Sequence, residues 1–268
     1  MRRDRAYPVR RSSLPMKQHR AISLVPILCL ASALSAQAAV SIYLSPNGIE
    51  SAETSGITGV TTETFEGAPL NYISSYSSTI GSYAGDGHII AENIYGGYQE
   101  GKYLGIYTSE AMTVTLTTAA SYFGFYFSAG DAGNVVELYS GGNLLLTFKT
   151  ADLINMLPRT EGSQIQAING SFYNTLDYYG QPGPNQGATN NEPYAYVHFV
   201  GTNGTTFDKI RFSEPTTATF ETDNHSVRTT APTLPGSLVD ITGAVPEPSG
   251  AALGLFSLGA LALFRRRA

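Results

Sequence analysis

The chain has 268 residues, with 16 Lys and Arg, 21 Asp and Glu, and one Cys. The charge is unevenly placed, because residues 39–245 hold six basic and nineteen acidic residues and so carry a net charge of −13. So acidic a segment repels nucleic acid and anionic lipid, and it favours cations or neutral polymers as partners. Composition therefore excludes nucleic-acid binding, and the single Cys excludes a disulfide within the chain.

The first 38 residues are predicted to be a signal peptide that directs export. A basic region, an apolar stretch and a small-x-small cleavage site follow one another: Lys17, His19 and Arg20, then residues 22–34, then Ala36 and Ala38. We expect the mature chain to begin near Ala39. Met16 is an alternative start to Met1, because a signal peptide of ordinary length begins there.

Residues 39–229 are expected to form one all-β domain, an antiparallel β-sandwich of jelly-roll type. Apolar and polar residues alternate over short runs, which Gly, Asn, Pro and Ser interrupt. Residues 121–128 put three Phe on one face of a strand and two Tyr on the other: Phe123, Phe125 and Phe127 against Tyr122 and Tyr126. The other predicted strands are residues 40–44, 88–91, 112–117, 134–139, 143–148, 194–200, 207–213, 219–221 and 226–229.

Three further segments are expected to differ from this pattern. Residues 69–107, rich in Gly and Tyr, predict long loops with short strands. Residues 150–157 predict a short helix with Thr150 as its N-cap and Pro158 just beyond its end. Residues 230–244 are rich in Pro and Thr and predict a linker.

The usual motifs of hydrolases and metalloenzymes are absent from residues 39–245. The three His of this segment do not occur in HExxH or another zinc spacing, and there is neither a Gly-x-Ser-x-Gly elbow nor a phosphate-binding glycine loop. We therefore expect no enzymatic activity. A polysaccharide-modifying enzyme that uses two carboxylates is the rival hypothesis.

Calcium is the one cofactor for which the sequence offers ligands. Hard cations prefer carboxylate, amide and carbonyl oxygens, which loops at the edges of a sandwich can supply. The candidate ligands are Asp131, Asn134, Asp208, Glu221 and Asp223. The alternative is that Asp131 and Asn134 only form a turn, and that Asp208 accepts a hydrogen bond from a backbone amide.

Tyrosines are frequent in residues 39–245, which contain no Trp. Exposed aromatic rings stack on sugar rings, although Tyr is equally at home half-buried in a strand. The candidates for stacking are Tyr72, Tyr76, Tyr83, Tyr95, Tyr98, Tyr103, Tyr173, Tyr178 and Tyr179. Ice binding would need a flat ladder of threonines, for which the sequence offers one row, Thr113, Thr115 and Thr117.

The C-terminal residues combine a short motif, an apolar run and a basic end: Val245, Pro246, Glu247 and Pro248, then residues 249–264, then Arg265, Arg266 and Arg267. As a helix the apolar run would be roughly 24 Å long at ~1.5 Å per residue, short of the ~30 Å bilayer core. The three Arg suit a cytoplasmic stop under the positive-inside rule.

This order of elements resembles the PEP-CTERM sorting signal, whose tail is also labelled the C-terminal domain of ice-binding proteins. The resemblance covers residues 245–268. It implies that an exosortase, a membrane-embedded transpeptidase, recognises the Pro-Glu-Pro motif and removes the helix. It also implies export, transient anchoring in the inner membrane, and a final place at the cell surface or in the extracellular matrix.

These observations lead to a hypothesis and an alternative. The chain is expected to be a non-enzymatic exported protein with a structural or exopolysaccharide-associated role. The alternative is a calcium-dependent carbohydrate-binding module displayed at the cell surface.

Overall fold

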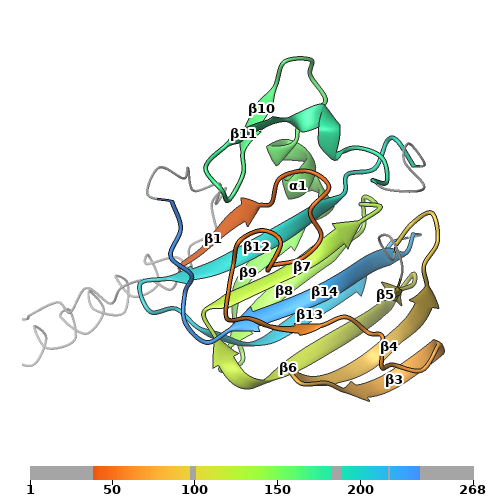
Figure 1. The fold of residues 1–268 in the computed structure, drawn as a ribbon. Helices are drawn as coiled ribbons and strands as arrows, with labels where there is room; N and C mark the ends of the chain where they lie inside the picture. The colour runs from red at the N-terminus through yellow and green to blue at the C-terminus, as the bar shows by residue number, and fades with distance from the viewer. Residues whose placement is uncertain (1–38, 97–100, 183–188, 217, 236–268) are drawn as a thin grey trace, which may run out of the picture. The chain divides into compact units, whose positions relative to one another are not determined.

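The computed structural model describes residues 39–96, 101–182, 189–216 and 218–235. Within these ranges the chain forms mostly strands, with one short α-helix and one 3-10 helix (Figure 1). The elements are β1 Ala39–Leu44, β2 Thr61–Glu63, β3 Asn71–Ser77, β4 Gly81–Ala91, β5 Lys102–Ile106, β6 Glu110–Ala120, β7 Tyr122–Ser128, β8 Val135–Ser140, β9 Asn143–Lys149, α1 Thr150–Met156, β10 Gln164–Gln166, β11 Phe172–Asn174, η1 Thr175–Tyr178, β12 Ala195–Thr202, β13 Phe207–Glu214 and β14 Phe220–Arg228.

The predicted targeting segments lie outside the described residues. They are the signal peptide with Ala36 and Ala38, the motif residues Val245, Pro246, Glu247 and Pro248, the apolar run 249–264, and Arg265, Arg266 and Arg267. The described ranges contain no helix that is both long enough and apolar enough to span a bilayer.

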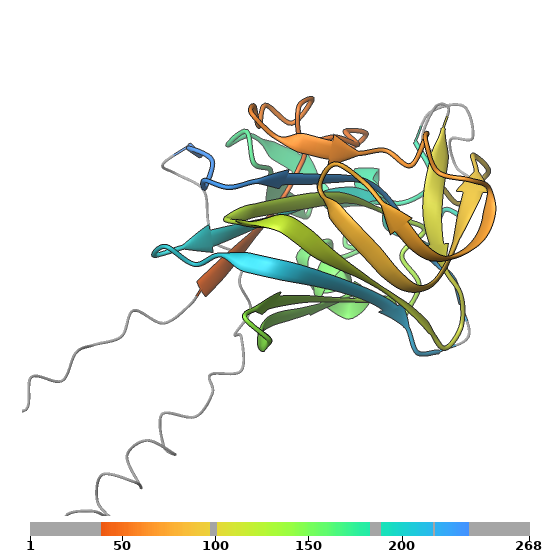
Figure 2. The same ribbon diagram turned by 90° about the horizontal axis from the view of Figure 1, so that it is seen from below.

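The large sheet is one continuous hydrogen-bonded ladder of twelve strands in the described residues. Its order is β1-β12-β7-β14-β5-β4-β6-β13-β8-β9, with β2 beside β14 and β3 beside β4. Strand β5 pairs with both β14 and β4, so it joins two layers that pack face to face. Figure 2 shows blue β14 and lighter-blue β13 in separate layers. The predicted antiparallel β-sandwich is confirmed, and its layers belong to a single folded sheet.

Strand β7 lies at the centre of the packing and is buried along its whole length. Its three Phe point between the layers, as the alternation predicted, and pack there with Phe199 of β12 and Phe212 of β13. Its two Tyr, Tyr122 and Tyr126, point the other way. They join an outer cluster with Ala52, Ile57 and Ile168, which come from connections between strands.

The prediction of long loops in residues 69–107 was wrong, because most of this segment forms β3, β4 and β5. Gly81 and Gly85 of β4 mark close contact with β6 instead of turns. A Cβ on Gly81 would lie 2.2 Å from the carbonyl oxygen of Thr115 on β6. The two strands can therefore pair at this point only because Gly81 has no side chain.

Two local predictions also need correction. The pieces expected at residues 219–221 and 226–229 belong to one strand, β14, whose register shifts between Asp223 and Ser226. Asn224 adopts a positive φ of 51° within this irregularity, which interrupts the alternation in the sequence.

The N-cap of helix α1 lies one residue earlier than predicted, so the helix itself begins at Thr150. Lys149 is the N-cap, and its backbone N–H donates to the Asp152 carboxylate at 2.8 Å. Thr150 does not cap the helix, because its hydroxyl donates to the carbonyl oxygen of Asp131. The helix gives way to the C-cap Leu157 just before Pro158, as expected.

Candidate functional site

Acidic side chains gather where β7 and β13 end and β14 begins. Glu214 closes β13, Glu221 follows the first residue of β14, and Asp131 lies in the turn after β7. Glu221 pairs with Ser128, the last residue of β7, while the Gly130 N–H donates to the Pro193 carbonyl next to Glu192. We call Asp131, Glu192, Glu214 and Glu221 the acidic cluster.

Burial and mutual repulsion change the protonation of this cluster. Burial raises the pKa of Glu221 to about 9, and the nearby charges of Asp131, Glu192 and Glu214 add to the effect. Burial also raises the pKa of Asp131 and that of Glu192. The Oε2 atoms of the three Glu residues have no hydrogen-bond partner among the described residues.

The predicted calcium ligands lie in three separate places. Asp131, Asn134 and Glu221 belong to the end of the sheet that holds the acidic cluster. Asn134 is fully buried there, its N–H donates to the Asp131 carbonyl at 3.3 Å, and its side-chain amide has no hydrogen-bond partner in the described ranges.

Asp208 and Asp223 are elsewhere. Asp208 accepts a hydrogen bond of 3.0 Å from the Gly141 N–H at the β8–β9 turn, as the alternative to calcium binding anticipated. Burial raises the pKa of Asp223 well above its usual value, and Glu50 and Glu66 contribute repulsion. No group of three or more His, Cys, Asp or Glu in the described residues is arranged to hold a metal ion, and calcium binding stays a prediction.

Two of the three His are core residues, which the sequence did not indicate. His198 lies between the Tyr122 hydroxyl at 2.8 Å and the Ser45 hydroxyl at 2.8 Å. His225 lies among the Phe of the core. Both are 0% exposed, and burial lowers the pKa of each to about 3.

The third histidine, His88, lies at the surface between two tyrosines. Its ring stacks on Tyr107 with 4.1 Å between centroids and meets Tyr72 edge-on at 5.5 Å. Tyr72 is 53% exposed and Tyr107 is 40% exposed. We call these three residues the aromatic platform. Only Tyr72 was among the predicted stacking residues; the structure buries Tyr83, Tyr103 and Tyr178, and Tyr98 lies outside the described residues.

Two carboxylates hold the platform in place. Glu110 accepts a hydrogen bond from the Tyr107 N–H at 2.9 Å, and its other oxygen lies 3.2 Å from His88 Nε2. Asp86 accepts a hydrogen bond from the Tyr72 hydroxyl. Tyr72 and His88 are paired residues on β3 and β4, so the register of these two strands brings their rings together.

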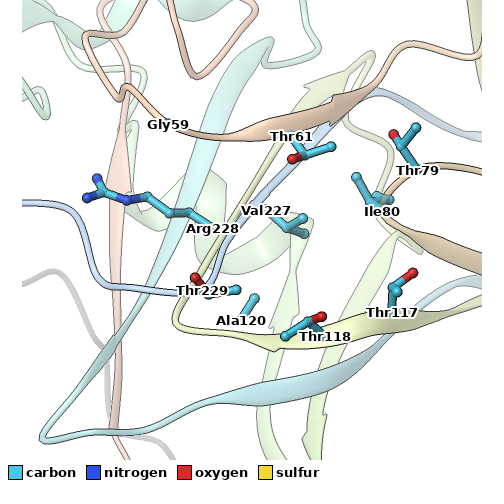
Figure 3. A pocket seen from close by; sticks show the side chains of 10 residues that line it. All are labelled: Gly59, Thr61, Thr79, Ile80, Thr117, Thr118, Ala120, Val227, Arg228 and Thr229. Atoms are coloured by element: carbon cyan, nitrogen blue, oxygen red, sulfur yellow. The ribbon is translucent and has the colours of Figure 1, made fainter.

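A pocket of about 240 Å³ lies between the ends of β2, β6 and β14 and the turn before β4 (Figure 3). Its side chains include five Thr and Arg228, but no Asp, Glu, His or Cys among the lining residues that the structure describes. The described lining therefore includes none of the side chains that usually act as a general acid or base. One lining residue, Thr117, is the last of the three threonines of β6 that the sequence offered as an ice-binding row. The row does not continue onto β13, because Thr113 pairs with Arg211 and Thr115 with Lys209.

Comparisons with known proteins identify only the C-terminal segment. None of the curated proteins matches the chain. A solved structure, the catalytic domain of a GH87 alpha-1,3-glucanase variant in complex with tetrasaccharides, matches at a TM-score of 0.32 and 19% identity. The match covers 68% of this chain and 30% of that chain, and so distant a likeness carries no argument about function.

Residues 244–268 match the PEP-CTERM protein-sorting motif, which confirms the sorting signal predicted from Pro246, Glu247 and Pro248. The match indicates an exported protein that is processed by an exosortase. The chain therefore carries a PEP-CTERM sorting signal at its C-terminus.

Proposed function

We propose that this chain is a non-enzymatic protein of the cell envelope or extracellular matrix, with a structural or polysaccharide-associated role. The observation that carries the proposal is the sorting motif at residues 244–268. A protein sorted in this way acts outside the cell, where polysaccharides are abundant and nucleotide cofactors are not. The strongly acidic domain suits neutral polymers as partners.

The environment of His198 supports a role without catalysis at this residue. The Ser45 hydroxyl lies 2.8 Å from His198 Nε2, a contact that resembles a nucleophile and its base. Both residues are 0% exposed, so no substrate reaches them. With a pKa lowered to about 3, His198 is also far too weak a base to accept a proton from serine near neutral pH.

The mass of the protein recovered from its own cells tests the proposal. We expect the mature chain to begin near Ala39 and to have lost the apolar tail, and we expect it in the envelope or matrix fraction. Replacing Glu247 by Gln should leave the tail attached and the protein in the inner membrane. The control is Pro235→Ala, an exposed proline outside the motif, which should be processed normally. A cytosolic protein with both ends intact would refute the proposal.

A calcium-dependent carbohydrate-binding module is the second candidate, favoured by the unpaired carboxylate oxygens of the acidic cluster. A divalent cation would compensate the repulsion among these groups, with Asp131 and Glu221 as the expected ligands. Polysaccharide binding measured with and without a chelator separates the two candidates. Loss of binding with the chelator favours the second, and unchanged binding favours the first.

A further inference from the structure

We propose that the aromatic platform, Tyr72, His88 and Tyr107, is a binding site for a neutral, hydroxyl-rich glycan chain. The inference rests on the proposed function, since the platform meets extracellular polysaccharide only if the domain is exported. It adds to that function a site, a ligand class and the residues that select it.

The exposure of the rings favours a sugar as the ligand. A pyranose ring has apolar C–H faces that pack on an aromatic ring, and hydroxyls around its edge that need polar partners. Tyr72 and Tyr107 offer ring surface to solvent, at 53% and 40% exposure. Asp86 and Glu110 stand beside the rings and can accept hydrogen bonds from the hydroxyls.

The platform is held in shape before any ligand arrives. Glu110 contacts both His88 and the backbone of Tyr107, and the Tyr72 hydroxyl is fixed by Asp86. Side chains that are already ordered lose little conformational entropy when a ligand binds. The arrangement therefore suits the weak, repeated contacts of a polymer better than a loose surface would.

The charges select a neutral chain. Carboxylates accept hydrogen bonds from hydroxyl groups, but they repel uronate, sulfate and phosphate groups at the same distance. The net charge of −13 over residues 39–245 strengthens this repulsion. A neutral glycan gains the stacking and the hydrogen bonds without that cost.

The platform is also open to a long ligand. Strand β3, which carries Tyr72, pairs only with β4 in the described sheet and forms its border there. Figure 1 shows β3 and β4 on the side away from α1, β10 and β11. Phe172 on β11 is 60% exposed but belongs to the separate two-stranded sheet, so it provides a matched control.

Affinity electrophoresis of the exported protein in gels that contain soluble polysaccharides tests the inference. The panel contains neutral glucans and galactomannans, a uronate polymer, and cationic chitosan. We expect retardation by at least one neutral polymer and none by the uronate polymer. Tyr72→Ala and Tyr107→Ala should each weaken neutral binding about tenfold, ~1.4 kcal/mol, whereas Phe172→Ala should not change it.

Thermal unfolding of each variant accompanies the binding measurement. Tyr72 and Tyr107 are exposed, so their removal should leave the unfolding temperature nearly unchanged, and any loss of binding then reflects the site. Neutral binding that is equal in wild type and both Tyr variants would overturn the inference. So would retardation by charged polymers alone, which salt should abolish. Either result leaves the proposed export and sorting intact, because those are judged by the mass and location of the mature chain.

Discussion

Tyr83 and His225 meet inside the core, where the Tyr83 hydroxyl lies 2.9 Å from His225 Nδ1. The other ring nitrogen of His225 lies 2.8 Å from the Thr222 hydroxyl. The imidazole stacks on Phe212 with 4.7 Å between centroids. A neutral His225 therefore satisfies both ring nitrogens while its ring packs like an aromatic core residue.

Replacing His225 by Ala should destabilise the fold strongly. The change leaves a cavity and deprives two buried hydroxyls of their partner, which together cost about 2–5 kcal/mol. Urea unfolding measures this loss. The control is His88→Ala at the surface, for which we expect a loss within about 1 kcal/mol. Equal losses at the two positions would contradict the structural role of His225.

The fold should be most stable between pH 4.5 and pH 6.5. These are the unfolded-state pKa values of the glutamate carboxyl and histidine imidazole groups that the fold buries. Burial lowers the pKa of His225 and His198 from 6.5 to about 3, so the unfolded chain binds more protons than the fold and stability falls as the pH drops from 6.5 towards 3. Burial raises the pKa of Glu221 from 4.5 to about 9 and that of Glu50 from 4.5 to about 7, so the fold binds more protons than the unfolded chain and stability falls as the pH rises from 4.5 towards those values. Unfolding temperatures from pH 3 to pH 9 check this dome; a maximum above pH 8 would contradict it.

Glu221→Gln should flatten the alkaline side of this curve, because the amide cannot lose a proton. The difference in unfolding temperature between pH 6 and pH 9 should shrink, while exposed Glu161→Gln leaves it unchanged.

Unfolding in the presence of added calcium tests whether the acidic cluster binds a cation. A rise of the unfolding temperature with calcium in wild type but not in Glu221→Gln would support a site at the acidic cluster, and equal responses would contradict it.

Gly124→Ala should destabilise the domain by about 1–3 kcal/mol, the range for overpacking a core. A Cβ at this position would lie 2.4 Å from the Tyr122 hydroxyl oxygen and 2.7 Å from the Tyr196 ring. Urea unfolding again provides the measurement. Gly67→Ala is the control, since its Cβ would meet only the Tyr76 hydroxyl at 3.7 Å. Comparable stability of the two variants would show that the tyrosines of the outer cluster can move apart.

The sequence predicted the alternating strands well because burial of one face leaves a period of two in the residues themselves. Phe123, Phe125 and Phe127 could be assigned to the core on that ground alone. The prediction of long loops in residues 69–107 failed because a segment whose glycines permit close pairing of strands has the same amino-acid composition as a glycine-rich loop. The irregularity at Asn224, which has a positive φ, interrupts the alternation of residues in β14, so the sequence predicted two strands where the structure has one.

By itself the sequence determined the sorting tail and the all-β class, because both depend on the order of neighbouring residues. Only the tertiary structure decided which polar residues share a site. Tyr72 and His88 face each other through the register of β3 and β4, and Tyr107 joins them from the turn after β5. Asp131 and Glu221 likewise come together through the pairing of β7 with β14, 90 or so positions apart in the chain. Contacts of this kind are fixed by long-range strand pairing, which leaves no periodic signal in the residues that take part.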